Sequence, residues 1–324
     1  GGGRKGNVPY GTLTAIDESP LKFGLLYAGS DDGLLHVTRD GGETWVKISD
    51  QLPAKCWVSR VQASAHARGR VYVALNGYRW DDFNAYLYVS EDYGATWTRI
   101  GTSLPAEPVN VVREDPVNPD VLYVGTDHNV YISLDRGASF QCLSGEFPDV
   151  PVHDLAIQAK AGDLVIGTHG RSMYKVGISQ VQALTAEVLA SSLTLFELPK
   201  KKYSANWGKK QPYKEAKDPE FPVWFYSGNK GEINWSVKMK DGGLVLNSGK
   251  ITCVKGLNLF NYGLDFQESQ TKRYKESLQA MQKSAKKPVQ IEKADTGKYY
   301  LRKGVYTFTV EKDGTSSDRD FVID

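Results

Sequence analysis

The chain has 324 residues, of which 40% are hydrophobic and 24% charged, a composition typical of a folded globular protein. No apolar run approaches the ~18 residues of a membrane-spanning helix, and a formal net charge of +2 excludes a strong overall attraction for nucleic acid. Three distant cysteines, Cys56, Cys142 and Cys253, exclude a disulfide scaffold and a zinc pattern. We expect no metal and no cofactor.

An internal repeat organises residues 1–198. The octapeptides 38–45 (TRDGGETW), 90–97 (SEDYGATW) and 133–140 (SLDRGASF) share the pattern Ser/Thr-x-Asp-x-Gly-x-Thr/Ser-aromatic. A period of ~40–50 residues that holds several short β-rich runs is the size of a propeller blade. The sequence therefore predicts an all-β chain that begins with a partial β-propeller of about four blade units.

The third unit places the octapeptide within a blade. Its runs 109–113, 121–125, 130–133 and 140–143 read as strands a, b, c and d, so the octapeptide occupies the c–d turn. Asp and Gly suit a tight turn, and the aromatic residue can pack between sheets. We expect structural roles for Asp40, Gly42, Trp45, Asp92, Gly94, Trp97, Asp135, Gly137 and Phe140.

The fourth unit lacks the octapeptide. Its runs 152–158, 164–167 and 172–176 read as strands, residues 178–191 as a helix, and residues 193–198 as the blade's outer strand. Residues 1–198 carry a net charge of −7 and residues 199–324 a net charge of +9. This step beside Pro199 predicts a domain boundary, followed by a basic linker over 199–219.

Short alternating runs dominate the second half. Six or seven strands over residues 220–324, separated by turns such as Asp241-Gly242-Gly243, suit an immunoglobulin-like β-sandwich. Residues 266–287 are charged and favour helix, so we predict a helical insertion there.

The octapeptides resemble the Asp-box, or BNR repeat. Together with the sequence that flanks these octapeptides, residues 8–198 resemble the sortilin-type, BNR-containing "glycosyl hydrolase" proteins of bacteria. This resemblance implies a larger parent protein with more blades and an exported, periplasmic or extracellular location. The start at Gly1-Gly2-Gly3, without Met, fits a piece of such a protein.

In a propeller, the b–c and d–a loops gather on one face, away from the c–d turns. The long second b–c loop holds the candidate ligand contacts Tyr78, Arg79 and Trp80, and later loops add His128, His169 and Arg171. Aromatic rings with polar groups suit either a sugar or a peptide. A packing insert between blades is the alternative interpretation of the same loop.

Hydrolysis of glycosides requires two carboxyl groups at a defined separation. Weak catalytic candidates on the same face are Asp31, Asp32, Asp81, Asp82 and Asp127. Two functions therefore stay open: a binding protein for glycan or peptide, or a sialidase- or xyloglucanase-like glycoside hydrolase. The expected partners are that ligand and the remaining blades of the parent protein, with neither nucleic acid nor a membrane.

Overall fold

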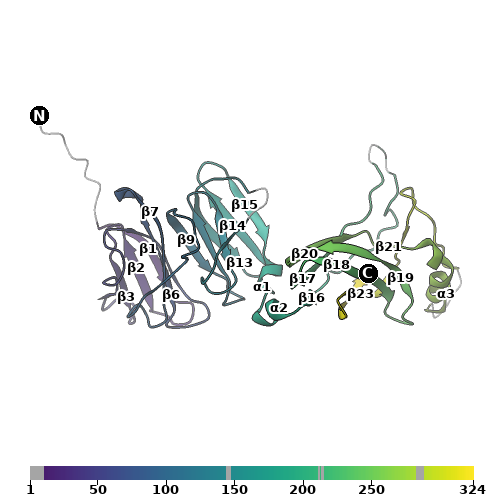
Figure 1. Cartoon of the computed structure of the whole chain (residues 1–324), viewed down its shortest axis with the longest axis horizontal. Coiled ribbons are helices and arrows are strands. Elements are labelled where there is room, and N and C mark those ends of the chain that lie inside the picture. The colour runs from purple at the N-terminus through teal and green to yellow at the C-terminus, as the bar shows by residue number, and fades with distance from the viewer. Residues whose placement is uncertain (1–10, 144–146, 211, 213–214, 282–287) are drawn as a thin grey trace, which may run out of the picture. The chain divides into compact units, whose positions relative to one another are not determined.

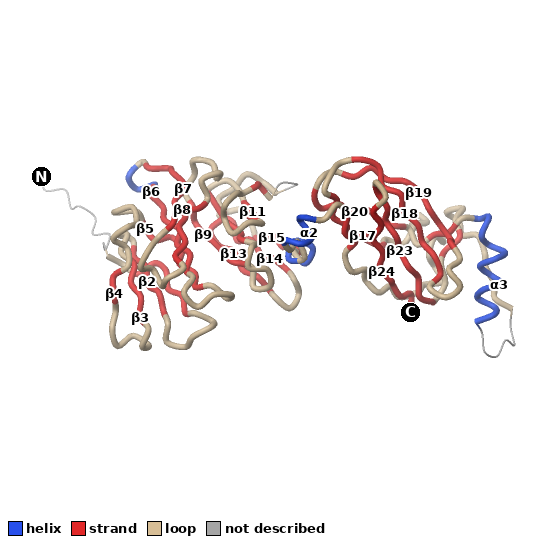
Figure 2. The backbone as a smooth tube through the Cα atoms, turned by 60° about the horizontal axis from the view of Figure 1, so that its bottom comes forward, coloured by secondary structure: helices blue, strands red, loops and turns tan. Residues whose placement is uncertain are grey.

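A computed structural model describes residues 11–143, 147–210, 212, 215–281 and 288–324 (Figure 1). The described chain is nearly all-β, with 45% strand and 9% helix, which confirms the predicted class. The helical segments are short (Figure 2). Internal contacts divide the chain into two compact units, Gly1–Leu184 and Thr185–Asp324.

The first unit is a partial β-propeller made of four antiparallel sheets in which strands pair in sequence order. Figure 1 shows these sheets one after another along the chain. The first sheet comprises β1 (Leu13–Glu18), β2 (Leu26–Ser30), β3 (Leu35–Thr38) and β4 (Val46–Lys47). The second comprises β5 (Trp57–Ala63), β6 (Val71–Gly77), β7 (Asp82–Ser90) and β8 (Thr98–Ile100), with the 3₁₀ helix η1 (Tyr78–Trp80). The third comprises β9 (Val109–Glu114), β10 (Leu122–Thr126), β11 (Val130–Ser133) and β12 (Gln141–Cys142), and the fourth β13 (Val152–Gln158), β14 (Asp163–Thr168) and β15 (Met173–Gly177).

The hydrophobic cores of this unit lie between successive sheets. One cluster joins Tyr27 of the first sheet to Val73 of the second, and another joins Tyr72 to Val124 of the third. The b strands β6 and β10 are buried along their whole length because each is covered on both faces. Burial of apolar surface between sheets therefore holds the array together.

The four strands expected in the third unit are confirmed within one or two residues, and each octapeptide spans a c–d turn as predicted. The predicted outer strand 193–198 is wrong as an element of the fourth sheet. Its strand β16 (Leu193–Leu195) pairs with β17 (Phe221–Ser227) of the second unit. The helix expected over 178–191 is two short helices, α1 (Ser179–Gln182) and α2 (Ala186–Ala190).

The second unit is a sandwich of two antiparallel sheets. One has the order β16-β17-β20 and the other β19-β18-β23-β24. Their new strands are β18 (Gly231–Met239), β19 (Val245–Cys253), β20 (Gly256–Tyr262), β23 (Gly304–Lys312) and β24 (Thr315–Ile323). One core contains Phe225 of the first sheet and Phe308 of the second. In the constant-type immunoglobulin order the fourth strand joins the sheet of the first two, whereas here β19 pairs with β18, so the immunoglobulin-like label stays a prediction.

The described part of the predicted linker 199–219 packs on the second unit. Lys201 bridges Ile323 in parallel, and the backbone N–H of Tyr203 donates to Asp324 O at 2.8 Å. The Trp207 ring lies 5.4 Å from the Tyr203 ring. The contact-based division after Leu184 accordingly lies ahead of the predicted boundary at residue 198.

The predicted insertion contains β21 (Asp265–Phe266), η2 (Glu268–Gln270) and α3 (Thr271–Met281), and β22 (Tyr299–Tyr300) follows it. Tyr274 anchors α3 because its ring is buried against Phe266. The insertion's last residues, 282–287, lie outside the described chain. Among the described helices, none has the length and hydropathy needed to cross a membrane.

Candidate functional site

Meandering connectivity gives every sheet of the first unit two distinct ends. Strand b ends and strand a begins at one end, which we call the loop face. Strand c ends in an Asp-box at the other end, which we call the box edge. The candidate ligand and catalytic residues lie at the loop face, and the structural residues lie at the box edge.

Exposed aromatic side chains gather at the loop face of the second sheet. Tyr78 and Trp80 are 47% and 58% exposed on η1. The Tyr78 ring lies 6.5 Å from that of Trp57, and the Arg79 guanidinium lies 5.6 Å from the Trp57 ring centre. Trp80 Nε1 donates to Lys55 O at 2.9 Å, which fixes the indole. Trp57 Nε1 is buried without a hydrogen-bond partner.

Asp31 anchors this cluster to the first sheet. Its buried carboxylate accepts hydrogen bonds from Gly11 N at 2.8 Å and Thr12 N at 2.9 Å, and it lies 3.3 Å from Arg79 Nη1. Burial opposes its ionisation, but these donors outweigh that effect and hold the pKa of Asp31 below its ordinary value. Asp31 therefore serves as a charged anchor for Arg79.

The other loop carboxylates make short local contacts. Asp32 accepts from the Ser30 hydroxyl. Asp82 accepts from Tyr86 Oη and Asn84 Nδ2, both at 2.7 Å, and the Tyr86 hydroxyl is the main reason that the pKa of Asp82 is lowered. Asp81 ends η1 in the left-handed conformation, with φ of 57° and its N–H bonded to Tyr78 O.

A chain of amide contacts continues the loop face to the third sheet. Asn76 Nδ2 donates to Asn110 Oδ1 at 3.1 Å, and Asn110 Nδ2 donates to Asp127 Oδ1 at 2.8 Å. Glu107 accepts from Thr126 Oγ1 at 2.6 Å. Sequence reasoning missed Trp57, Asn76, Glu107 and Asn110. Asn76 begins the predicted second b–c loop, Glu107 precedes and Asn110 lies at the start of the predicted strand 109–113, and Trp57 had no predicted strand around it.

The two candidate histidines lie in the b–c loops of different sheets: His128 in the third sheet and His169 in the fourth. His128 Nδ1 lies 3.3 Å from Glu107 Oε2, whereas the His169 ring lies 5.4 Å from the His153 ring. In the described chain His128 is paired with Glu107 and His169 packs on His153, rather than the two loop histidines on each other, and Arg171 is exposed. Among the described residues no three His, Cys, Asp or Glu side chains group as a metal site.

The a strands of the four sheets, β1, β5, β9 and β13, carry a second polar cluster that the sequence did not indicate. Arg60 Nη2 lies 2.7 Å from Asp154 Oδ1, and Arg113 Nη2 lies 3.6 Å from the same oxygen. Asp17 accepts from Ala63 N at 2.7 Å. Burial raises the pKa of Asp17, although this hydrogen bond and the charges of Arg113 and Arg60 act in the opposite direction.

The box edge repeats one set of bonds. In the second box, Asp92 accepts from Ser90 Oγ at 2.7 Å, Thr96 N at 2.8 Å and Thr96 Oγ1 at 2.7 Å. The first and third boxes repeat these three contacts through Asp40 and Asp135. Each carboxylate thus accepts hydrogen bonds from hydroxyl and backbone N–H groups of its own turn, at the end of the sheet opposite the loop face.

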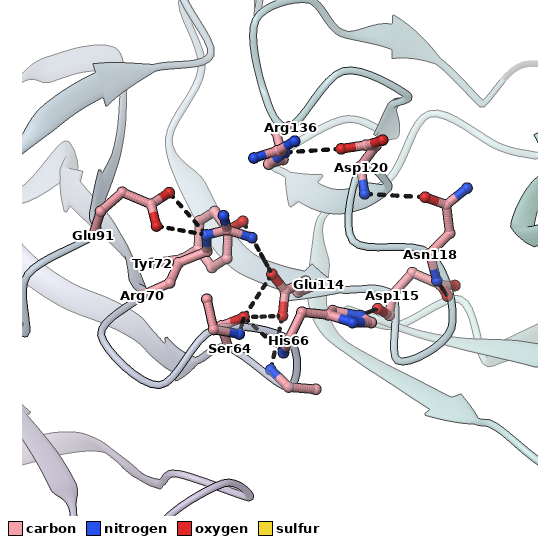
Figure 3. A network of polar contacts seen from close by, with 12 residues as sticks. Ser64, His66, Arg70, Tyr72, Glu91, Glu114, Asp115, Asn118, Asp120 and Arg136 are labelled. Carbon is pink, nitrogen blue, oxygen red and sulfur yellow. Dashed lines mark hydrogen bonds and ion pairs between the residues drawn. The ribbon is translucent and has the colours of Figure 1, made fainter. Parts of the chain in front are cut away.

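A buried polar network reinforces the box edge between the second and third sheets (Figure 3). The fully buried Glu114 carboxylate accepts from Ser64 Oγ at 2.7 Å and Tyr72 Oη at 3.2 Å. Arg70 lies between Glu91, at 2.8 Å, and Glu114, at 3.4 Å. Burial of charge is tolerable here because every partner is paired.

The chain matches the family model described as sortilin, neurotensin receptor 3 (Sortilin-Vps10) over residues 85–232. It is 25% identical over 313 residues to a xyloglucanase of Hypocrea jecorina, covering 83% of this chain and 36% of that protein. It is also 25% identical over 158 residues to an oligoxyloglucan-reducing end-specific xyloglucanase of Emericella nidulans, covering 44% of this chain and 19% of that protein. The chain thus spans about a third of the length of the first relative and less of the second.

Two solved structures are similar to this chain, one over most of its length and the other over about two thirds of it. The GH74 xyloglucanase from Xanthomonas campestris is 14% identical with a TM-score of 0.43, covering 97% of this chain and 44% of that chain. YCF48 bound to D1 peptide is 16% identical with a TM-score of 0.40, covering 68% of this chain and 64% of that chain. With three Asp-boxes at the c–d turns of successive sheets, the chain is similar to sortilin over residues 85–232 and to xyloglucanases, in agreement with the resemblance to sortilin-type, Asp-box-containing, glycosyl hydrolase-like propeller proteins.

Proposed function

We propose that the loop face of the first unit binds a carbohydrate chain through Tyr78 and Trp80. The observation that carries this proposal is the pair of exposed rings, each positioned by its neighbours. Trp80 is fixed through its Nε1 bond to Lys55, and Tyr78 through its N–H bond to Asn76 Oδ1 at 3.0 Å. A preorganised aromatic surface presents apolar area to a sugar ring without further loss of side-chain freedom.

Polar groups beside the rings suit sugar hydroxyls. The partly exposed carboxylates of Asp82 and Asp127 lie at this end of their sheets, whereas the amides of Asn76 and Asn110 are buried and paired with each other. Two of the matched relatives are named for xyloglucan or its oligosaccharides, which makes neutral β-glucans the first ligands to test. An exported location is part of this proposal, because it places the protein where such polysaccharides occur.

Affinity electrophoresis and calorimetry with xyloglucan test the proposal. We expect Trp80→Ala and Tyr78→Ala each to weaken binding about tenfold or more, equivalent to about 1.4 kcal/mol. Trp45→Ala is a matched control, because Trp45 is 43% exposed but lies at the box edge. Equal binding by all three variants and the unchanged protein would reject the loop face as the ligand site.

Hydrolysis by this chain is the second candidate, and Asp17 is the observation that favours it. A glycosidase needs two carboxyl groups, and Asp17 and Asp154 both lie on a strands of the first unit, where Arg60 lies 2.7 Å from Asp154. Burial raises the pKa of Asp17, the direction that a general acid requires, whereas the pKa values of Asp31 and Asp82 are lowered. Release of reducing ends from xyloglucan, abolished by Asp17→Asn, would establish hydrolysis. Retained binding without such release would leave the binding function alone.

A further inference from the structure

A small pocket opens in the second unit where residues 203–209 meet the segment 290–302. It has a volume of about 270 Å³, and both segments contribute to its wall. Sites for drug-sized ligands usually measure about 300–1,000 Å³, so this pocket suits a ligand with a single ring. All of its described wall residues belong to the second unit, and neither candidate function above uses it.

Arg302 gives this pocket a partly buried positive charge. Its Nη2 donates to Gln290 O at 2.8 Å, its Nη1 donates to Tyr203 Oη, and its Nε is buried without a hydrogen-bond partner. Both acceptors are neutral groups. None of the ion pairs in the described part of the second unit involves Arg302. The guanidinium therefore lacks a counter-charge there.

The remaining residues of the second unit offer no carboxylate to Arg302. Residues 211, 213, 214 and 282–287 lie outside the described ranges, and none of them is Asp or Glu. Charges removed from water are normally paired, because an unpaired one loses hydration without compensation. An anion supplied by a ligand would provide the missing counter-charge.

Two lysines add positive charge to the same pocket. Lys209 is exposed, and Lys293 lies 3.0 Å from Glu268. Glu292 is the only acid among the described residues of the wall, so three cations face one carboxylate. This excess of positive charge favours an anionic group. A carboxylate suits a guanidinium best, because it can accept two parallel hydrogen bonds from it.

Three aromatic rings also line the pocket. The rings of Tyr203 and Trp207 lie 5.4 Å apart and those of Trp207 and Tyr300 6.4 Å apart, both edge to face. Gly208 allows this close approach, because a Cβ there would lie 2.4 Å from Tyr300 Cε2. Gly208 O accepts from Thr296 N at 3.0 Å, which holds the two segments together. The apolar face of a ring-shaped ligand suits such a wall.

We propose that this pocket binds a uronic acid unit, whose carboxylate pairs with Arg302 and whose ring packs against Trp207. Ser204 and Gln290 also line the pocket and can exchange hydrogen bonds with the hydroxyl groups of a sugar. The combination of charge and ring distinguishes this ligand from a neutral sugar and from a simple anion. The site is independent of the loop face and of its proposed ligand.

Calorimetric titration of the full chain with glucuronate, glucose and sulfate tests the proposal. We expect glucuronate to bind about tenfold more tightly than glucose, which has no carboxylate, equivalent to about 1.4 kcal/mol. We expect a similar margin over sulfate, which has no ring. Glucuronate binding should weaken as the ionic strength rises, because salt screens the partly exposed cations.

Two variants and a matched control locate the site. Arg302→Gln should weaken glucuronate binding about tenfold, since it removes the charge that pairs with the carboxylate. Lys209→Gln changes an exposed side chain and should weaken binding about threefold, as expected for an exposed charge. Lys210→Gln is the control, because Lys210 is also exposed but does not line the pocket, and it should leave binding unchanged.

Four results would overturn the proposal. Absence of glucuronate binding, or equal affinities for glucuronate and glucose, would exclude recognition of the carboxylate. Equal affinities for glucuronate and sulfate would make the pocket a general anion site. Glucuronate binding that survives both Arg302→Gln and Lys209→Gln but is lost in Trp80→Ala would assign the ligand to the loop face. Loss of xyloglucan binding alone in Trp80→Ala would show that the two sites are separate.

Discussion

At the scale of single residues, the repeat positions the same side chain in different polar surroundings. Tyr27, Tyr72 and Tyr123 occupy equivalent positions in three b strands, and all are 0% exposed. The hydroxyl of Tyr72 donates to Glu114 at 3.2 Å and that of Tyr123 to Asp115 at 3.1 Å. The hydroxyl of Tyr27 is buried without a hydrogen-bond partner.

This difference predicts opposite effects of one substitution. We expect Tyr27→Phe to leave the free energy of unfolding unchanged or to raise it by about 1 kcal/mol, because it removes an unpaired buried hydroxyl. Tyr72→Phe is the matched control and should lower stability by about 1 kcal/mol, since it removes a bond to Glu114. Urea denaturation measures both. Equal losses for the two variants would show that Tyr27 has a partner in solution.

Residue type and loop position predicted the exposed part of the candidate site but not its connections. Tyr78, Arg79 and Trp80 stand out in the sequence because three large side chains follow one another in a b–c loop that is longer than the others. Trp57 and Asn110 do not, because each begins a strand and reads as part of it. Their proximity to the loop depends on which strand ends meet, and sequence spacing alone does not encode that.

At the scale of elements, the Asp-box is a turn closed by its own carboxylate. Hydrogen bonds from the Thr96 hydroxyl, the Thr96 N–H and the Ser90 hydroxyl lower the pKa of Asp92 from 3.8 to about 2. A group whose pKa is lowered by folding contributes stability above its unfolded pKa. That contribution is lost as the pH falls from about 4 towards 2.

Removal of this carboxylate should therefore destabilise the protein in a pH-dependent way. We expect Asp92→Ala to lower the free energy of unfolding by about 2 kcal/mol at pH 7, with a smaller difference from the unchanged protein near pH 2. Glu43→Gln, an exposed change within the first box, should have little effect. Denaturant unfolding between pH 2 and 7 checks this, and a loss independent of pH would argue against the ionised carboxylate as the cause.

Strand positions were predictable where the repeat and the alternation agreed, as in the third sheet. Residues 193–198 were assigned to the wrong sheet because LTLFEL has the pattern of a buried strand and lies close to the fourth unit in sequence. The pattern identifies a strand but not its partner. Pairing of Thr194 with Tyr226 follows from apolar burial in the second unit's core.

At the scale of the whole molecule, the described chain has separate hydrophobic cores in its two units. One cluster contains buried residues from Leu193 to Ile323, whereas the other three lie within Leu25–Ile178. Cooperative unfolding depends on a shared core, so a core substitution should act mainly on its own unit.

Phe308→Ala tests this separation. Phe308 is fully buried, and its removal should cost the second unit about 3–5 kcal/mol. Val305→Ala is the control on the same strand, since Val305 is 43% exposed. Hydrogen exchange should accelerate in β17, β18 and β23 while β6 and β10 keep their rates. Equal acceleration in both units would mean that they unfold as one.

The sequence by itself determined the β class, the blade-sized repeat, the position of each Asp-box and the exposed rings of the second b–c loop. These features are local, because turn chemistry and alternation act over a few residues. Tertiary structure alone decided which sheet β16 joins, that Asp31 holds Arg79, and that Ile16 is exposed where Val61 is buried. Those outcomes depend on contacts between segments that lie 20 or more residues apart in the sequence. Burial of a side chain requires two surfaces that fit each other, so the sequence pattern of one segment does not determine it.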